Sequence, residues 1–341
     1  MLAVVVDKFS PVGSIDIRSV EEPSVPDGHA LIDVAATGLG FVDGLKVAGL
    51  YQTKDPLPFI PGMEFSGVIS RVGTGAERLK VGDRVFGQAP RGALAERISV
   101  PAIQLLRMSE HTSFAQAAAV PVNYLTALYG LRERASLRPG ELLLILGAAG
   151  GTGTAAIKVG KMLGAEIIAA ASTEEKRAFA LAEGASLAIN PAQPQWRDEL
   201  KALTNGRTVD VIYDVVGGDI SPIAFRTLGW RGRHLAVGFA AGAIPTLTFN
   251  IPLLKGASLI GVDSAQIQKR EPDMYVRLMS EIESALATGK LEPPPVQTFA
   301  FDQFQHAFEA MASRRAAGKV VVMSSSPSAA AQNTDRSAYR T

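Results

Sequence analysis

The chain has 341 residues, of which 47% are hydrophobic and 20% are charged, and its formal net charge is +1. Chains longer than about 250–300 residues tend to split into domains, so we expect two domains. The near balance of 34 basic and 33 acidic residues disfavours nucleic acid as a partner. The absence of cysteine excludes disulfides, thiolate nucleophiles and cysteine zinc sites.

No apolar run reaches the about 18–20 residues that cross a bilayer, and the N-terminus has no basic region followed by a cleavage site. We therefore expect a soluble, cytoplasmic protein with no membrane partner. The four histidines lie far apart without metal-ligand spacing, so no metal site is predicted. Any chemistry must come from an organic cofactor or from ordinary side chains.

Residues 1–110 alternate short apolar runs with Gly, Pro and Asp turns, which is typical of a barrel-like β domain rather than of βαβ units. After a first strand at the N-terminus, the runs expected to form strands are 30–36, 67–72, 84–86 and 94–100. Prolines at 56, 58 and 61 predict an irregular loop between the first two of these runs.

From about residue 113 the pattern changes to alternating helices and strands. The expected order is helix 113–134, strand 141–146, helix 152–164, strand 166–171, helix 172–183, and strands 209–214 and 234–237. Ser172 and Glu175 have the spacing of a capping box at the start of the third helix. This alternation predicts a parallel, doubly wound sheet.

The last part of the chain predicts a helix near 272–287, a helix at 301–313 and a strand at 319–323. We expect these pieces to complete the first domain, which is then discontinuous in sequence. The polar segment 324–341 predicts a flexible tail.

The strongest local motif is Gly147-x-x-Gly150-x-x-Gly153, which joins the strand 141–146 to the helix 152–164. Glycine permits a tight turn and lets the backbone approach a diphosphate, to which the helix N-terminus offers free N–H groups and partial positive charge. A strand before and a helix after the turn are the setting that a dinucleotide fingerprint requires. The alternative is a glycine turn that only permits close packing of the helix on the strand.

The second strand ends without the Asp or Glu that NAD-binding proteins place there to hold the ribose hydroxyls. A carboxylate at this point would repel a 2′-phosphate, whereas the Ser172 hydroxyl and the Lys176 ammonium would hold it. Glu174 and Glu175 are ordinary partners of the helix dipole in a first turn, and a plain solvated Lys176 is the alternative. The sequence favours NADPH as the cofactor.

Six motifs occur in order, namely 49–51 (GLY), 61–68 (PGMEFSGV), 81–85 (VGDRV), 119–127 (AVPVNYLTA), 147–153 and 214–217 (DVVG). Together they resemble the zinc-independent quinone oxidoreductase (zeta-crystallin-like) branch of the medium-chain dehydrogenase/reductase superfamily over about residues 1–323. The resemblance implies an α/β protein in which a Rossmann doubly wound parallel sheet is inserted into a GroES-like β-barrel catalytic domain. The implied parts are 1–120 (catalytic domain, first part), 121–255 (Rossmann NADP-binding domain), 256–323 (catalytic domain, closing part) and 324–341 (flexible C-terminal tail).

The resemblance also implies a set of cofactor contacts. By position these are Phe41, Val42 and Asp43 in the catalytic domain, and Thr126, Gly150, Gly151, Thr152, Ser172, Lys176, Asn190, Val216, Gly238, Phe239, Ala240, Gly261, Val262 and Arg314. Our catalytic hypothesis uses the region of Thr126 to position the nicotinamide amide, takes the proton from solvent or Tyr51, and keeps Asp43 as a third candidate.

Each of these roles has a structural alternative. The alternatives that stay open are a cleft-lining Tyr51, a turn residue at Asp43, and core positions for Phe41 and Phe239. For Glu64 the open alternative is a buried ion pair with an arginine.

Zinc-dependent relatives resemble this chain but carry a cysteine at the position of Gly40 and a histidine at that of Met63, so both ligands are missing here. The quinone oxidoreductase branch often has Asn at the position of Gly40 and polar or aromatic residues at that of Leu45. Pro191 displaces a tyrosine that often lines the adenosine-phosphate pocket. These departures predict a roomier, less polar substrate cleft.

Three functions remain open. The first is hydride transfer from NADPH to a quinone, the second is reduction of an enone or enoyl thioester, and the third is a non-catalytic NADPH-binding sensor or structural protein in the manner of lens crystallins. The expected partner is a small-molecule electron acceptor. The resemblance further implies a homodimer that pairs through the Rossmann sheet edge near 246–262.

Overall fold

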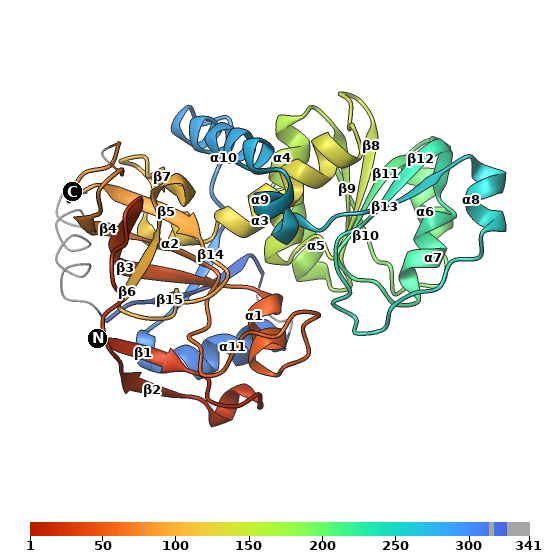
Figure 1. Cartoon of the computed structure of the whole chain (residues 1–341). Helices are drawn as coiled ribbons and strands as arrows, with labels where there is room; N and C mark the ends of the chain where they lie inside the picture. The colour runs from red at the N-terminus through yellow and green to blue at the C-terminus, as the bar shows by residue number, and fades with distance from the viewer. Residues whose placement is uncertain (77, 314–316, 326–341) are drawn as a thin grey trace, which may run out of the picture. The chain divides into compact units, whose positions relative to one another are not determined.

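A computed structural model describes residues 1–76, 78–313 and 317–325, and the chain divides into two compact units (Figure 1). The first unit comprises Met1–Val122, Met279–Ala287 and Pro293–Thr341, and the second comprises Asn123–Leu278 and Thr288–Glu292. The predicted tail at 324–341 lies outside the described residues except for its first two positions.

The first unit contains a seven-stranded sheet of order β14-β15-β3-β4-β5-β7, in which β6 also pairs with β3, and a two-stranded sheet of β1 and β2. The strands are β1 (Leu2–Val5), β2 (Asp16–Ser19), β3 (His29–Leu39), β4 (Glu64–Val72), β5 (Arg84–Gln88), β6 (Arg97–Pro101), β7 (Leu105–Arg107), β14 (Val296–Phe299) and β15 (Lys319–Met323). The helices are α1 (Phe41–Val47), α2 (Phe114–Ala118) and α11 (Phe304–Ala312), with 3-10 turns η1 (Val12–Ser14), η2 (Ala102–Gln104) and η5 (Phe301–Gln303).

Alternation along β3 builds the core of this unit. Ala30, Ile32 and Val34 are fully buried and form one cluster with Phe65 and Ile69 of the neighbouring antiparallel strand β4. Because successive side chains of a strand point to opposite faces, these alternate residues in the first half of β3 enter the same cluster. The β-rich first domain predicted from the turn pattern is therefore confirmed.

The second unit contains a six-stranded, all-parallel sheet of order β10-β9-β8-β11-β12-β13, which is the doubly wound order. Its strands are β8 (Leu142–Leu146), β9 (Glu166–Ala170), β10 (Leu187–Ile189), β11 (Val209–Asp214), β12 (Leu228–Ala236) and β13 (Ser258–Gly261). Its helices are α3 (Pro121–Leu128, with two residues in the first unit), the π-helical turn η3 (Tyr129–Arg134), α4 (Gly151–Met162), α5 (Glu174–Ala182), α6 (Trp196–Leu203), α7 (Ile220–Phe225), α8 (Asn250–Lys255), η4 (Ser264–Gln266) and α9 (Ile267–Arg270). Helix α10 (Pro272–Ala287) contributes residues to both units.

Helices cover both faces of this parallel sheet (Figure 1). On one face Leu142, Leu144 and Leu146 of β8 pack with Trp196 and Leu200 of α6. On the opposite face α4 lies so close that a Cβ added to Gly160 would come 2.8 Å from Leu143 Cδ2. Burial on both faces explains why β8 is apolar at every position, and the predicted doubly wound fold is confirmed.

Three predictions need correction. Residues 256–278, which we assigned to the closing part of the catalytic domain, belong to the second unit, because β13 pairs in parallel with β12 as its sixth strand. Helix α5 is capped by the side chain of Thr173, which accepts from the Lys176 N–H, so the capping box predicted at Ser172 and Glu175 is wrong. The helix predicted at 113–134 is divided into α2, α3 and η3.

Within the described part of the chain, no helix is both long enough and apolar enough to span a lipid bilayer.

Candidate functional site

The carboxyl edge of the six-stranded sheet carries most of the predicted cofactor residues. Gly150, Gly151 and Thr152 follow β8, Ser172 and Lys176 follow β9, Asn190 follows β10, Val216 follows β11, Gly238, Phe239 and Ala240 follow β12, and Gly261 and Val262 lie at the end of β13. In doubly wound sheets ligands bind at this edge, where the strand order reverses. Here the reversal falls between the adjacent strands β8 and β11.

The three glycines of the turn differ in what surrounds them. Gly147 has a φ of 74°, and a Cβ on it would lie 2.9 Å from the side chains of Val215 and Val216. A Cβ on Gly153 would lie 2.3 Å from the carbonyl oxygen of Gly147. The packing alternative therefore accounts for these two glycines. It does not account for Gly150, whose added Cβ would have its nearest neighbour at 3.7 Å.

The N-terminus of α4 is suited to an anion. Its N-cap is Gly150, no side chain caps it, and its first turn contains no acidic residue. The next helix of the sheet, α5, is instead capped by Thr173 and has Glu174 and Glu175 in its first turn. The first N–H groups of a helix have no intrahelical acceptor, so those of α4 stay available to a ligand with negative charge.

Arg177 is a residue of α5 whose side chain reaches back to the end of β9. Its Nη1 donates a hydrogen bond to the carbonyl oxygen of Ala171 at 3.1 Å. This contact brings a guanidinium to the strand end where dinucleotide-binding proteins recognise the adenosine ribose. Arg177 was not among the predicted site residues, although it directly follows Lys176 in the sequence.

Asp214, the last residue of β11, organises the turn on the other side of the strand-order reversal. Its Oδ1 accepts from the N–H groups of Val216 (2.9 Å) and Gly217 (3.0 Å). Its Oδ2 accepts from the Ser221 hydroxyl and lies 3.0 Å from His234 Nε2. Burial acts to raise the pKa of Asp214, but the hydrogen bonds from His234, Ser221 and Gly217 outweigh it and hold the pKa below its ordinary value.

Thr126 of α3 is mostly buried, and its hydroxyl lies 2.7 Å from that of Ser264, which follows β13. The role of Thr126 in positioning a nicotinamide amide stays a prediction. Neither Asp214 nor its partners Ser221 and His234 were predicted as site residues, since only the motif 214–217 was visible in the sequence.

In the first unit, Phe41, Val42 and Asp43 are the first three residues of α1. Asp43 Oδ2 accepts from the Gly40 N–H at 2.8 Å, and Asp43 Oδ1 is buried without a hydrogen-bond partner among the described residues. Burial raises the pKa of Asp43 to about 6, although the Gly40 N–H and the Lys319 ammonium act to lower it. Asp43 caps the helix that presents Phe41 and Val42.

A buried ion pair lies beside Asp43. Glu64, at the start of β4, pairs with the Lys319 ammonium of β15, and its other oxygen accepts from the Val122 N–H at 3.0 Å. The buried partner of Glu64 is thus a lysine and not the arginine considered from the sequence. A Cβ on Gly40 would lie 3.6 Å from Asp43 Oδ2 and 3.6 Å from Lys319 Nζ. The position of the cysteine in zinc-dependent relatives is therefore bordered by an ammonium.

The aromatic candidates are accessible rather than internal. Phe41 and Phe239 are each 41% exposed, so the core alternative for them is wrong. Tyr51 is half-buried in the loop after α1. Arg314 lies outside the described residues. Across residues 1–76, 78–313 and 317–325, no group of three His, Asp or Glu side chains could hold a metal ion.

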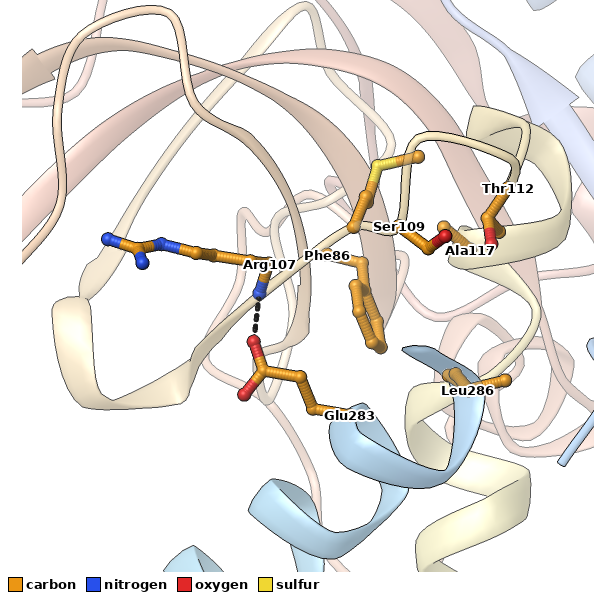
Figure 2. A pocket seen from close by; sticks show the side chains of 8 residues that line it. Phe86, Arg107, Ser109, Thr112, Ala117, Glu283 and Leu286 are labelled. Carbon is orange, nitrogen blue, oxygen red and sulfur yellow. Dashed lines mark hydrogen bonds between the residues drawn. The ribbon is translucent and has the colours of Figure 1, made fainter. Parts of the chain in front are cut away.

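Figure 2 shows a small pocket in the first unit, between β5, the 107–112 segment, α2 and α10. Phe86, Ala117 and Leu286 give it an apolar wall, and the Arg107 N–H donates to Glu283 Oε1 at 2.6 Å. None of the predicted site residues lines this pocket.

Comparison with known families agrees with this architecture. A model of the alcohol dehydrogenase GroES-like domain matches residues 26–128, and a model of the zinc-binding dehydrogenases matches residues 151–281. A GroES-like domain followed by a Rossmann-type parallel sheet defines an oxidoreductase of the medium-chain dehydrogenase/reductase superfamily.

Similar proteins place the chain in one family within this superfamily. Quinone oxidoreductase-like protein 2 of Mus musculus is 36% identical over 309 residues, which cover 90% of this chain and 88% of the relative. Its Nematostella vectensis homolog is 34% identical over 94% of this chain and 85% of its own length. The chain belongs to the quinone oxidoreductase family of the superfamily.

Solved structures give the same fold. The Escherichia coli quinone oxidoreductase complexed with NADPH superposes with a TM-score of 0.85 at 27% identity, covering 95% of this chain and 100% of that one. The quinone oxidoreductase of Thermus thermophilus, also solved with NADPH, has a TM-score of 0.82 at 33% identity with the same coverage. The CurK enoyl reductase has a TM-score of 0.86 at 27% identity, covering 95% and 99%.

Proposed function

We propose that this oxidoreductase is NADPH-dependent and zinc-independent, and that it reduces a quinone. The observation that carries the proposal is the uncapped N-terminus of α4, which begins at Gly150 directly after β8 at the carboxyl edge of a parallel sheet. Without a cap or a first-turn acid, its N–H groups and partial positive charge remain to be satisfied by an anion such as a dinucleotide diphosphate.

Different residues at this edge bind different parts of the cofactor. Gly150, Gly151 and Thr152 bind the diphosphate, and the turn that Asp214 organises presents Val216 beside it. The residues of the other strand ends, 238–240 and 261–262, complete the edge. A bound NADPH supplies the hydride, so the protein contributes binding, orientation and exclusion of water.

The end of β9 favours NADPH over NADH. The two positions directly after Ala171 are Ser172 and Thr173 rather than an acidic residue, and the Arg177 guanidinium bonds to the carbonyl oxygen of Ala171. Together with Ser172 and Lys176 it provides positive charge and hydrogen-bond donors for a 2′-phosphate. Two of the similar solved structures were obtained with NADPH, which supports the same choice.

The side chains available as metal ligands in the first unit support zinc independence. Gly40 has no side chain and Met63 is a weak, soft ligand, so neither provides the thiolate or imidazole that zinc prefers. The Lys319 ammonium next to Gly40 is paired with Glu64 and has no lone pair to offer a metal ion.

Reduction of a quinone by hydride transfer consumes one hydride and one proton. The proton comes from solvent or from the Tyr51 hydroxyl, and Tyr51 is half-buried in the loop that follows α1. Asp43 holds the start of α1 through the Gly40 N–H, so its contribution is to position Phe41 and Val42 rather than to transfer a proton.

The similarity to the CurK enoyl reductase supports a second candidate, reduction of an enone or an enoyl thioester. NADPH oxidation by the purified protein should be measured in parallel with 1,4-benzoquinone, a simple enone and an enoyl thioester. We expect the largest kcat/KM with the quinone and a larger value with NADPH than with NADH. A preference for the thioester would establish the second candidate, and tight NADPH binding without turnover of any acceptor would establish a sensor or structural role.

A second test asks whether the enzyme needs zinc for turnover. Turnover should be unchanged after dialysis against a chelator, and a requirement for stoichiometric zinc would contradict the proposal.

A further inference from the structure

The side chain of Asn123 is buried beside the glycine turn, with only 5% of the residue exposed. It lies in the first turn of α3, and its Oδ1 accepts a hydrogen bond from the Thr152 hydroxyl at 2.9 Å. Its Nδ2 is buried and has no hydrogen-bond partner within the described part of the chain. The motif 119–127 pointed to this segment, but no role was assigned to Asn123.

A buried amide nitrogen without an acceptor is costly, because its two N–H groups have lost water and gained nothing in return. Rotating the amide by 180° about Cβ–Cγ does not remove the deficit. Nδ2 would then donate one hydrogen to Thr152 Oγ1, which would free the hydroxyl hydrogen of Thr152, while the second amide hydrogen would still lack an acceptor. In either orientation the pair of Asn123 and Thr152 retains unused donors.

These donors lie where α4 begins. Thr152 is the second residue of α4, the N-cap Gly150 provides no side-chain oxygen, and the first turn contains no carboxylate. The missing partner is therefore an acceptor that the described protein does not supply at this point. An oxygen-rich anion would satisfy both the Asn123 amide and the helix N-terminus.

We propose that Asn123 is a cofactor-binding residue that donates a hydrogen bond to the dinucleotide diphosphate and fixes the Thr152 hydroxyl beside it. The proposal rests on the NADPH-binding function above and adds a residue from outside the glycine turn. A purely structural role, in which Asn123 only links α3 to α4 through Thr152, makes a different prediction. It requires the acceptor Oδ1 but has no use for the donor Nδ2.

Two substitutions separate these roles. Asn123→Asp keeps an acceptor for the Thr152 hydroxyl but replaces the donor with a negative charge, whereas Asn123→Ala removes both. If Asn123 contacts the diphosphate, Asn123→Ala raises the Kd for NADPH about tenfold or more, and Asn123→Asp raises it further. If Asn123 is only a link, Asn123→Asp binds NADPH better than Asn123→Ala.

The control is Thr154→Val. Thr154 lies in the same helix, is fully buried, and its hydroxyl has no hydrogen-bond partner among the described residues, so this near-isosteric change removes a hydroxyl without removing a contact. It should leave the Kd for NADPH unchanged.

The Kd should be measured by isothermal titration calorimetry on each full-length protein, with the melting temperature of the free protein recorded alongside. A loss of binding counts only for a variant whose far-UV circular dichroism shows a folded protein at the titration temperature. If Asn123→Asp unfolds, Asn123→Ala still tests the proposal, because an unchanged Kd for NADPH would overturn it.

The outcomes are distinct. Absence of NADPH binding by the wild-type protein would contradict the proposed function itself. Wild-type binding with a folded Asn123→Ala variant within twofold of it would overturn only the role of Asn123. Diphosphate contacts act on binding rather than on the chemical step, so the variants should raise the KM for NADPH and leave kcat within about twofold.

Discussion

Gly150 and Gly153 stand three residues apart in the same turn, yet an added methyl group would have opposite consequences. At Gly153 it would overlap the carbonyl oxygen of Gly147, and backbone atoms cannot move aside cheaply. At Gly150 it would meet no protein atom closer than 3.7 Å. Gly153 is needed to pack the helix on the strand, and Gly150 leaves space over the helix N-terminus.

We expect Gly150→Ala to fold with a loss of at most about 1 kcal/mol, because alanine is a poorer N-cap than glycine, and to raise the Kd for NADPH strongly. Gly153→Ala should instead lower the melting temperature or prevent folding. Urea denaturation and NADPH titration of both variants provide the measurement. A Gly150→Ala protein that binds NADPH like the wild type would show that the diphosphate does not approach this residue.

Asp43 predicts a pH dependence of stability. Its pKa is about 6 in the folded protein and near its ordinary value of 3.8 in the unfolded chain. Between these values the folded state binds more protons, so this group makes the protein less stable as pH rises from about 4 to about 6 and has no further effect above that. The difference of about two pH units corresponds to about 3 kcal/mol.

Asn at position 43 cannot ionise but still accepts from the Gly40 N–H. The unfolding free energy of Asp43→Asn relative to the wild type should therefore increase by about 2–3 kcal/mol between pH 4 and pH 7. Urea denaturation at several pH values measures this difference. A difference that is constant across the range would mean that Asp43 titrates alike in both states.

At the scale of elements, Asp214 joins β11, the turn that follows it, α7 and β12. Its two oxygens accept from two turn N–H groups, from Ser221 at the start of α7 and from His234 of β12. All of these partners lose their acceptor if the carboxylate is removed. A single substitution at Asp214 therefore acts on several elements.

We expect Asp214→Ala to reduce the unfolding free energy by about 3–5 kcal/mol, since it leaves buried donors unpaired. Ser221→Ala should cost about 1–2 kcal/mol because it removes one donor and leaves the other three. Thr154→Val, which removes a buried hydroxyl that has no partner among the described residues, is the matched control and should be nearly neutral. Equal losses for Asp214→Ala and Ser221→Ala would contradict the central role of the carboxylate.

On the scale of the whole molecule, several large apolar side chains near β13 are exposed. Phe249 and Leu253 of the α8 region are 92% and 78% exposed, and Trp230 of β12 is 76% exposed. β13 is the last strand in the sheet order, so its outer edge is open to pairing within the described residues. Exposed apolar patches beside an open edge mark association sites, and we propose that a second copy of this chain binds here.

Multi-angle light scattering at tens of micromolar protein should show a wild-type dimer and a monomeric Phe249→Asp variant with an intact circular dichroism spectrum. Ile103→Asp is the control, because Ile103 is a 60% exposed apolar residue of η2 in the first unit and should leave the dimer intact. A monomeric wild-type protein would contradict this proposal.

Local patterns in the sequence were sufficient to predict the helices and strands that depend mainly on residues nearby in the chain. The helix at 272–287 and the strand at 319–323 have the predicted bounds, and the glycine turn lies between the expected strand and helix. Periodicity and turn chemistry act over a few residues, so they can be read without knowing the rest of the fold. The ordered motifs then established the family.

Only the tertiary structure could assign 256–278 to the second unit, because the four-residue strand β13 is defined by its pairing with β12. The same holds for contacts between residues far apart in sequence, such as Asp214 with His234, Glu64 with Lys319, and Asn123 with Thr152. Such hydrogen bonds and ion pairs form because folding removes water from both partners at once. The sequence by itself therefore determined the family and the position of the glycine turn, while packing decided which buried polar groups pair with one another.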